Sequence, residues 1–236
     1  MISRTELRHL KGRFFVSLSY LSAILILLAL VFILGGITVK AIPSLNMHFI
    51  LTSESNQPGL GGAIGNAVAG TILLSVFSTV LATPIAVGTS IYLKRYAKDG
   101  IAVRIFRFLI DVLSGTPSIV LGIFGFLVFA YYMQSITGGF SLISGSIALA
   151  ILILPVIERA AEEAIDTVDT DIEAASYALG ATKWETIKKI TVPSALSGIM
   201  TGIVLGTGRA AEESAVVIFT AGYTQFYPEF KVAASD

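Results

Sequence analysis

The sequence predicts an all-α membrane protein, a polytopic bundle of transmembrane helices with one short helical projection outside the membrane. The composition indicates this class, because 54% of the 236 residues are hydrophobic, only 14% are charged, and the mean hydropathy is +0.82. These values are too apolar for a soluble domain of this size. Two further observations agree: the apolar residues gather in runs of membrane-spanning length, and the basic residues gather between alternate runs.

Five apolar stretches are candidates for transmembrane helices, each of which needs roughly 20 predominantly apolar residues. The apolar part of the fourth is short, so we expect its helix to continue out of the membrane through Glu158 and Arg159. Residues 114–117, Ser-Gly-Thr-Pro, interrupt the third stretch, and we interpret them as a helix kink. The five stretches are residues 14–39, 64–93, 106–133, 142–157 and 194–222.

The basic residues predict how these helices are oriented. Thirteen of the sixteen Lys and Arg residues lie before the first stretch, between the second stretch and the start of the third, or between the fourth and the fifth. Cytoplasmic loops carry an excess of Lys and Arg, so we expect these three segments and the N-terminus to be cytoplasmic. Lys40 and Lys231 then lie outside, and Arg209 falls within the fifth stretch.

Several kinds of chemistry are excluded or disfavoured. The chain has no cysteine, which excludes thiol catalysis and thiolate metal sites, and its only histidines are His9 and His48. An intramembrane enzyme that uses His48, Glu212 and Glu213 has no supporting Ser/Lys, paired-aspartate or HExxH pattern. The phosphate-binding motif GxxxxGK[ST] is also absent. We therefore expect no enzymatic activity and no cofactor in this chain.

A series of acidic residues follows the fourth stretch. Their spacings of three and four place several on one face of a helix that leaves the membrane. We interpret most of them as a face exposed to water. The series consists of Glu158, Glu162, Glu163, Asp166, Asp169, Asp171 and Glu173.

Residues 171–193 form a polar, helix-forming segment between two apolar stretches. Thr170 or Asp171 can cap a short helix that starts near Ile172, and Gly180 can end it. A second short helix is expected over residues 182–189. Such a segment either docks a partner protein or anchors the loop at the membrane surface.

The second short helix places Trp184 and Ile187 at a spacing that predicts a shared face. Pro193 is suited to the first turn of the following span, where its missing N–H is not needed. The segment is thus expected to form two short helices joined by a glycine and followed by a proline.

This segment resembles the coupling loop of permeases from ATP-binding-cassette importers, which docks into the nucleotide-binding ATPase subunit. Gly180, Ile190 and Pro193 match the spaced Gly, Ile and Pro of that loop. The usual glutamate position holds Ala174, and Glu173 comes one residue early. The resemblance implies that residues 171–190 couple to the ATPase subunit. The residues expected to make this contact are Glu173, Ala174, Ala175, Tyr177, Gly180 and Trp184.

Other segments extend the resemblance over about residues 60–222. They include IGNAVAGTILLSVFSTVLATPIAVGTSIYL, DVLSGTPSIVLGIFGF, SGSIALAILILPVIERAAEEAI and LGTGRAAEESAVVIFTAG. These are similar to permease subunits of the phosphate-specific transporter, of the PstA type first and the PstC type second. The resemblance implies one transmembrane permease domain over 1–236, with its core at about 64–222, in the cell inner membrane.

The same resemblance implies the partners of this chain. They are a second permease subunit of the PstC type, a nucleotide-binding ATPase subunit that holds ATP and Mg, and a periplasmic or extracellular phosphate-binding protein. It also implies a sixth span that this sequence lacks, which we attribute to truncation. Other oxyanions, such as molybdate or sulfate, and a non-transporting sensory or structural role remain alternatives.

Three charged residues, Arg209, Glu212 and Glu213, lie deep in the fifth apolar stretch. Charged side chains in a membrane normally face a protein interior or an aqueous path. Arg209 can reach either carboxylate from the same helix face. Two interpretations are open: a buried ion pair that fixes helix packing, or a phosphate path in which Arg209 binds the anion and the glutamates limit its affinity.

Overall fold

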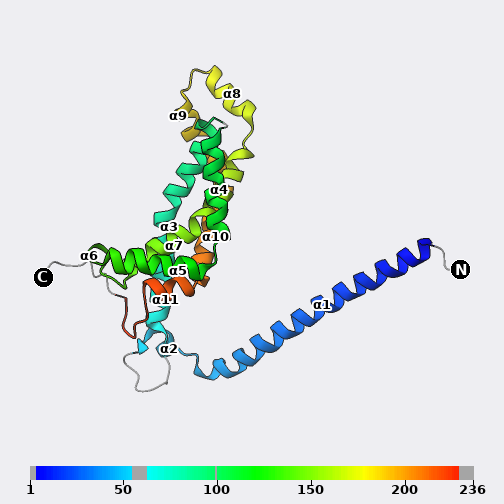
Figure 1. Cartoon of the computed structure of the whole chain (residues 1–236), viewed down its shortest axis with the longest axis vertical. Helices are drawn as coiled ribbons and strands as arrows, with labels where there is room; N and C mark the ends of the chain where they lie inside the picture. The colour runs from blue at the N-terminus through cyan, green and yellow to red at the C-terminus, as the bar shows by residue number, and fades with distance from the viewer. Residues whose placement is uncertain (1–3, 55–62, 99, 229–236) are drawn as a thin grey trace. The chain divides into compact units, whose positions relative to one another are not determined.

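The computed structural model describes residues 4–54, 63–98 and 100–228, and all its regular elements within these ranges are helices. The chain divides into two compact units, Met1–Leu51 and Thr52–Asp236, each of which is described by itself. Figure 1 shows the helices of both units with their labels.

The first unit consists of α1 (Arg4–Ala41), the 3-10 turn η1 (Ile42–Ser44) and α2 (Met47–Leu51). From Lys11 onward, α1 is a continuous apolar helix whose residues are not buried by the rest of the chain. Its large apolar side chains are exposed all round, as in a helix whose surroundings are lipid or other membrane helices. The first predicted span is thus a single helix that is long and apolar enough to cross a membrane.

The second unit contains the remaining helices, three of which include π-helical turns. Their bounds are α3 (Gly65–Ile91), η3 (Tyr92–Tyr96), α4 (Ile101–Gly115), α5 (Ser118–Gly125), η4 (Phe126–Tyr132), α6 (Gln134–Thr137), α7 (Leu142–Asp166), α8 (Thr170–Ala178), α9 (Lys183–Thr186), η5 (Ile187–Thr191), α10 (Val192–Glu212) and α11 (Ala215–Thr220). Helices α3, α7 and α10 pack together, with α8 and α9 beyond one end of them (Figure 1).

Helix α7 is the centre of this unit. Leu149, Ile153 and Ile157 on α7 are completely buried and belong to one apolar core with residues of α3 and α10. On α10, Gly202 lies against Ala160 of α7 so closely that an added Cβ would lie 2.6 Å from the Ala160 side chain. Gly198 and Gly206 make similar approaches to α7. The glycines thus let two helix backbones pack closely, as small residues do in membrane helix pairs.

The third predicted span is not one straight helix. It is divided into α4 and the α5–η4 helix, which are bent by 100° relative to each other. The break is at Thr116 and Pro117, both of which have extended backbone angles. A proline disfavours helical geometry in the residue before it, which explains the position of the break. Among the described residues, four helices are long and apolar enough to span a membrane, and five if the bent pair counts as one.

The fifth predicted span is also interrupted. Helix α10 ends at Glu212, Glu213 has an extended backbone, and α11 begins at Ala215. The continuous apolar helix in this region runs instead from Lys183 to Glu212, because α9 continues through η5 into α10. The expectation of an uninterrupted helix over residues 194–222 is therefore wrong, and its charged residues lie at a helix end.

We predict that Gly202→Val lowers the stability of the second unit by about 1–3 kcal/mol, because the side chain must push α10 away from α7. Thermal unfolding of the purified protein in detergent measures this effect. Gly208→Val is the matched control on the same helix, since a Cβ there meets nothing within 4 Å. Equal destabilisation by the two variants would contradict the close-packing argument.

Candidate functional site

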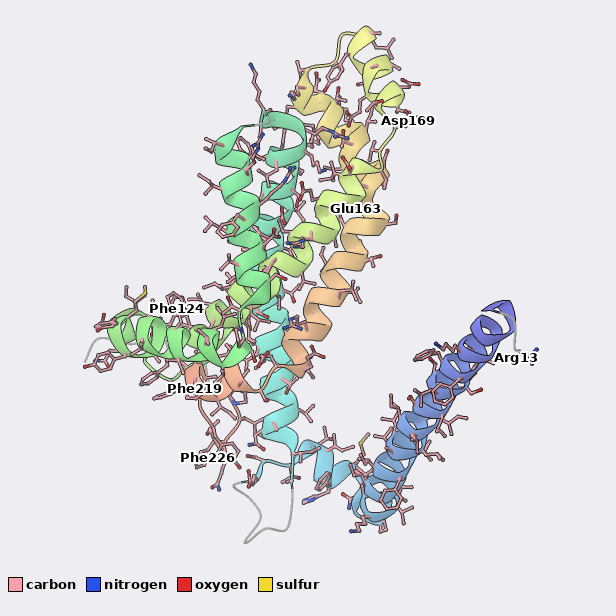
Figure 2. All side chains as sticks on the ribbon, turned by 45° about the vertical axis from the view of Figure 1, so that its right-hand side comes forward. Arg13, Phe124, Glu163, Asp169, Phe219 and Phe226 are labelled. Carbon is pink, nitrogen blue, oxygen red and sulfur yellow. The ribbon has the colours of Figure 1, made fainter. Side chains whose placement is uncertain are left out.

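The first candidate site is the segment that joins α7 to α10, residues 169–191, which we call the projection. Asp169 begins it, where α7 gives way to α8 (Figure 2), and its Oδ1 accepts a hydrogen bond from the Asp171 N–H at 2.9 Å. Asp169 is thus the N-cap of α8, and the expected caps Thr170 and Asp171 are wrong by one or two residues. An N-cap side chain satisfies an N–H that the helix leaves free.

Gly180 ends α8 as predicted. Its φ of +83° lies in the left-handed region, which favours glycine. The N–H of Gly180 bonds to the carbonyl of Tyr177 at 2.9 Å, and the N–H of Ala181 bonds to the carbonyl of Ser176 at 3.2 Å. This pair of hydrogen bonds is the Schellman motif, which satisfies the last carbonyls of a helix.

Helix α9 starts with a capping box. The Glu185 N–H donates to Thr182 Oγ1 at 3.3 Å, and the Thr182 N–H donates to Glu185 Oε2 at 2.9 Å. This reciprocal arrangement fixes the point at which the chain turns back toward the membrane spans. Pro193 lies in the first turn of α10, directly after η5 and inside the continuous helix from Lys183 to Glu212.

Glu173 faces the interior of the chain. Its side chain is 8% exposed, and its Oε1 accepts hydrogen bonds from Arg95 Nε at 2.8 Å and Thr191 Oγ1 at 2.6 Å. Arg95 also donates to the carbonyl of Ile165 at 2.9 Å. One buried carboxylate therefore ties α8 to the end of the α3 helix and to the start of the α10 helix. The expectation that Glu173 contacts a partner conflicts with this burial.

Two more contacts support the projection from inside. The hydroxyls of Ser176 and Thr186 are 2.9 Å apart and buried, which joins α8 to α9. Lys183 Nζ lies 4.9 Å from the ring centroid of Tyr96, a cation–π contact between α9 and η3. The projection is thus held to the ends of the membrane helices at several points.

The other residues expected to contact a partner are exposed. Ala174, Ala175, Tyr177, Gly180 and Trp184 all lie on the surface. Two large apolar residues that the sequence analysis did not select, Ile172 and Leu179, are exposed as well, and Leu179 is 90% exposed. We call the group of Ile172, Ala174, Ala175, Tyr177, Leu179 and Trp184 the outer face of the projection.

An exposed apolar group on a polar segment is typical of an interaction surface. Trp184 is 60% exposed, whereas Ile187 is only 1% exposed, so the prediction that they share a face is wrong. Side chains three residues apart on a helix point in directions that differ by about 60°. The boundary of the buried region lies between Trp184 and Ile187. The Trp184 side chain is therefore available for contact.

The acidic series is less exposed than predicted. Glu158 is 2% exposed, and Glu162 accepts a hydrogen bond from Arg107 at 2.8 Å. Lys94 Nζ lies 3.1 Å from Asp166 and 3.6 Å from Glu162. The water-exposed interpretation is thus wrong for Glu158, Glu162 and Glu173, whereas Asp166 remains exposed. Glu162 and Glu173 are covered by basic residues of other helices, which the local spacing does not show.

A second candidate site is the charged break, which we define as residues 209–214. Arg209 Nη1 lies 3.6 Å from Glu212 Oε1, and the two side chains are 45% and 69% exposed. Glu213 Oε1 instead accepts a hydrogen bond from the Ala215 N–H at 3.0 Å, at the start of α11. The three residues thus do not form one buried cluster. The guanidinium of Arg209 is accessible, and Glu213 stabilises a helix terminus.

Comparison with known proteins places the chain in a family. Residues 85–230 match the family described as binding-protein-dependent transport system inner membrane component. This chain belongs to that family. It is therefore a multi-pass inner membrane permease subunit of an importer, and such a subunit works with an ATPase subunit and a substrate-binding protein. The predicted fold class and the resemblance to importer permeases are confirmed.

Two relatives and one solved structure illustrate the similarity. The chain is 36% identical over 205 residues to the probable ABC transporter permease protein YqgI of Bacillus subtilis, covering 86% of this chain and 68% of YqgI. It is 34% identical over 220 residues to the phosphate transport system permease protein PstA of Yersinia pestis, covering 93% and 73%. An inward-facing structure of the MetNI methionine ABC transporter matches the fold with a TM-score of 0.50 at 22% identity, covering 63% of this chain and 68% of that chain.

We predict that Glu173→Ala destabilises the projection by about 1–3 kcal/mol, because it leaves the buried end of Arg95 without its partner. Limited proteolysis should then cleave the projection of the permease faster than in the parent protein. Asp171→Ala, which removes an exposed carboxylate two residues away, is the control. Unchanged cleavage in Glu173→Ala would show that the buried carboxylate does not hold the projection.

Proposed function

We propose that this chain is the permease subunit of an ATP-driven inorganic phosphate importer, in which it forms part of the translocation path. The observation that carries this proposal is the 34% identity over 93% of the chain to a protein named phosphate transport system permease protein PstA. Relatives from Pasteurella multocida and Haemophilus influenzae with the same name match over the same share of the chain.

The charged break supplies chemistry that suits phosphate. An arginine donates paired hydrogen bonds to the oxygens of an oxyanion from one planar group. Arg209 has a single exposed carboxylate near it, Glu212, at 3.6 Å, so its guanidinium retains donors for an anion. A nearby carboxylate also weakens anion binding, which favours release during transport. Glu213 contributes by fixing the start of α11 beside this arginine.

The projection is proposed as the contact with the nucleotide-binding ATPase subunit. Its outer face presents Tyr177, Leu179 and Trp184 to a partner. Glu173 has an internal role in this proposal, since its bonds to Arg95 and Thr191 connect α8 to two membrane helices. Movement imposed on the outer face by ATP-driven closure of the ATPase subunits would thus be transmitted to α3 and α10.

The proposed assembly contains a second permease subunit of the PstC type and a phosphate-binding protein on the outer side. The N-terminus and the projection are proposed to face the cytoplasm, where the ATPase subunit binds ATP and Mg. Residues 1–236 are proposed to serve as one transmembrane domain. These assignments agree with the concentration of Lys and Arg around the projection and between α3 and α4.

Uptake of radiolabelled phosphate tests the proposal. The complex of this chain is reconstituted into vesicles with its binding protein outside, with and without ATP inside. We expect uptake that needs internal ATP and resists a tenfold excess of sulfate or molybdate. Uptake abolished by one of those anions would assign that oxyanion instead, and no uptake of any of the three would leave a sensory or structural role.

We predict that Arg209→Ala lowers phosphate uptake by about 10- to 100-fold, because charge-assisted hydrogen bonds contribute about 1.5–3 kcal/mol. Co-purification of the other subunits should be unchanged, since the Arg209 side chain is 45% exposed and its ion pair with Glu212 joins residues of the same helix. Arg209→Lys keeps the positive charge but lacks the planar guanidinium. Its phosphate uptake should lie between the uptake of the parent protein and that of Arg209→Ala. Loss of the assembled complex would favour a structural ion pair.

We predict that Leu179→Asp lowers co-purification of the ATPase subunit by about tenfold, because it places a charge at the most exposed large apolar residue of the outer face. The thermal stability of the permease itself should not change, since Leu179 is 90% exposed. Lys188→Asp, at an exposed position on the inner part of the projection, is the control. If the ATPase subunit co-purifies in normal amounts with the Leu179→Asp permease, the outer face is not the docking surface.

A further inference from the structure

Among the described residues, five buried side-chain atoms have no hydrogen-bond partner: three are hydroxyls, of Ser75, Thr83 and Ser146, and the other two belong to charged groups of opposite sign. One is Oε1 of Glu158 on α7, whose residue is 2% exposed, and the other is Nε of Arg107 on α4. Buried polar groups almost always have a hydrogen-bond partner, so each of these atoms requires an explanation. An acceptor and a donor that lack partners on two neighbouring helices indicate that the two could satisfy each other.

More carboxylates than cations lie around these two atoms. Arg107 Nη2 bonds to Glu162 Oε1 at 2.8 Å, and Lys94 Nζ lies 3.6 Å from the same oxygen and 3.1 Å from Asp166. The carboxylates of Glu162 and Asp166 thus share the cations of Arg107 and Lys94. Glu158 forms no ion pair with a described residue, although a buried charge without a partner is costly.

The register of the two helices shows how the partners could change. Helices α4 and α7 are antiparallel here, since Arg107 pairs with Glu162 and, farther along α4, Asp111 pairs with Arg159 earlier on α7. Glu158 precedes Glu162 by four residues, which places it on the same face of α7, about 6 Å along the axis. A shift of α4 by one helical turn would bring Arg107 to Glu158.

The same shift provides a replacement at Glu162. Arg104 lies three residues before Arg107, on the same side of α4, and forms no ion pair within the described residues. After a one-turn shift, Arg104 would lie opposite Glu162. The shift separates Asp111 from Arg159, but these side chains are 58% and 52% exposed, and exposed ion pairs contribute little.

Few side chains of α4 are buried against the rest of the chain. Of its residues, Val103 and Ile110 are buried, and most of its large apolar side chains are exposed. A cavity of about 510 Å³ separates part of α4 from α3, between residues such as Gly88 and Tyr92 on one side and Val103 and Phe106 on the other. Extended backbone at Gly100 and at Thr116 bounds the helix at both ends.

We propose that Glu158 is a second acceptor for Arg107, and that α4 shifts by one helical turn along α7 between two states of the transport cycle. In one state Arg107 pairs with Glu162, as in this structure. In the other, Arg107 pairs with Glu158 and Arg104 pairs with Glu162. Glu158 is thus a positioning residue that stabilises the second state. This inference rests on the proposed function only in assuming an ATP-driven cycle, and it does not depend on which anion is transported.

Cross-linking between introduced cysteines tests the shift, and the parent chain has no cysteine to interfere. Asp111→Cys with Arg159→Cys reports the present register. Asp111→Cys with Val156→Cys reports the shifted register, because Val156 lies nearly one turn earlier on α7. A short thiol-specific cross-linker is applied to the complete complex, at rest and after trapping with ATP and vanadate.

We expect the 111–159 cross-link to dominate at rest and the 111–156 cross-link to rise about tenfold in the trapped complex. Glu158→Gln, added to each pair, should abolish that rise and lower transport about tenfold, whereas Glu158→Asp should retain much of both. Glu163→Gln, which changes an exposed carboxylate on the same helix, should alter neither measurement.

Two results would overturn the proposal. One is a 111–156 cross-link whose yield is the same at rest and in the trapped complex, since α4 would then not change register. The other is a Glu158→Gln complex that assembles in normal amounts and still shows the rise, since Glu158 would then have only a structural role. If the cross-link changes as expected but the complex takes up no phosphate, only the assignment of phosphate as the substrate is contradicted.

Discussion

The buried carboxylate of Glu173 is the interaction on which the projection depends. Its two hydrogen bonds join α8 to Arg95, at the end of the α3 helix, and to Thr191, at the start of the α10 helix. Without this contact, α8 would be a short helix on a loop, and short helices have little stability of their own. The contact fixes the inner side of the projection to the ends of two membrane helices.

The apolar elements of this fold could be predicted from the sequence because their signal is local. The runs that became α1, α3 and α7 are long, and the hydrophobic pattern alone identifies them. The predictions that were wrong concern the two places where a predicted span is broken. Pro117 was visible, yet the sequence does not show that it turns the chain by 100° rather than merely kinking one span. The direction in which the chain turns at a break depends on the helices against which the two parts pack.

The candidate site was predicted less completely, for a different reason. Gly180 could be identified as a helix end because its role needs only its own backbone freedom. The inward orientation of Glu173 could not, since its partner Arg95 is 78 positions away and only the folded chain brings them together. Leu179 was likewise overlooked, because an apolar residue in a polar segment can be either buried or offered to a partner.

The exposure of the charged break has a consequence for how cells must handle this protein. Arg209 and Glu212 lie uncovered at the end of a membrane helix, and lipid is a poor environment for such groups. A copy left in the bilayer without its proposed partner permease would therefore expose these charges to lipid. In the proposed assembly, such surplus copies are expected to be removed by membrane proteases faster than assembled ones.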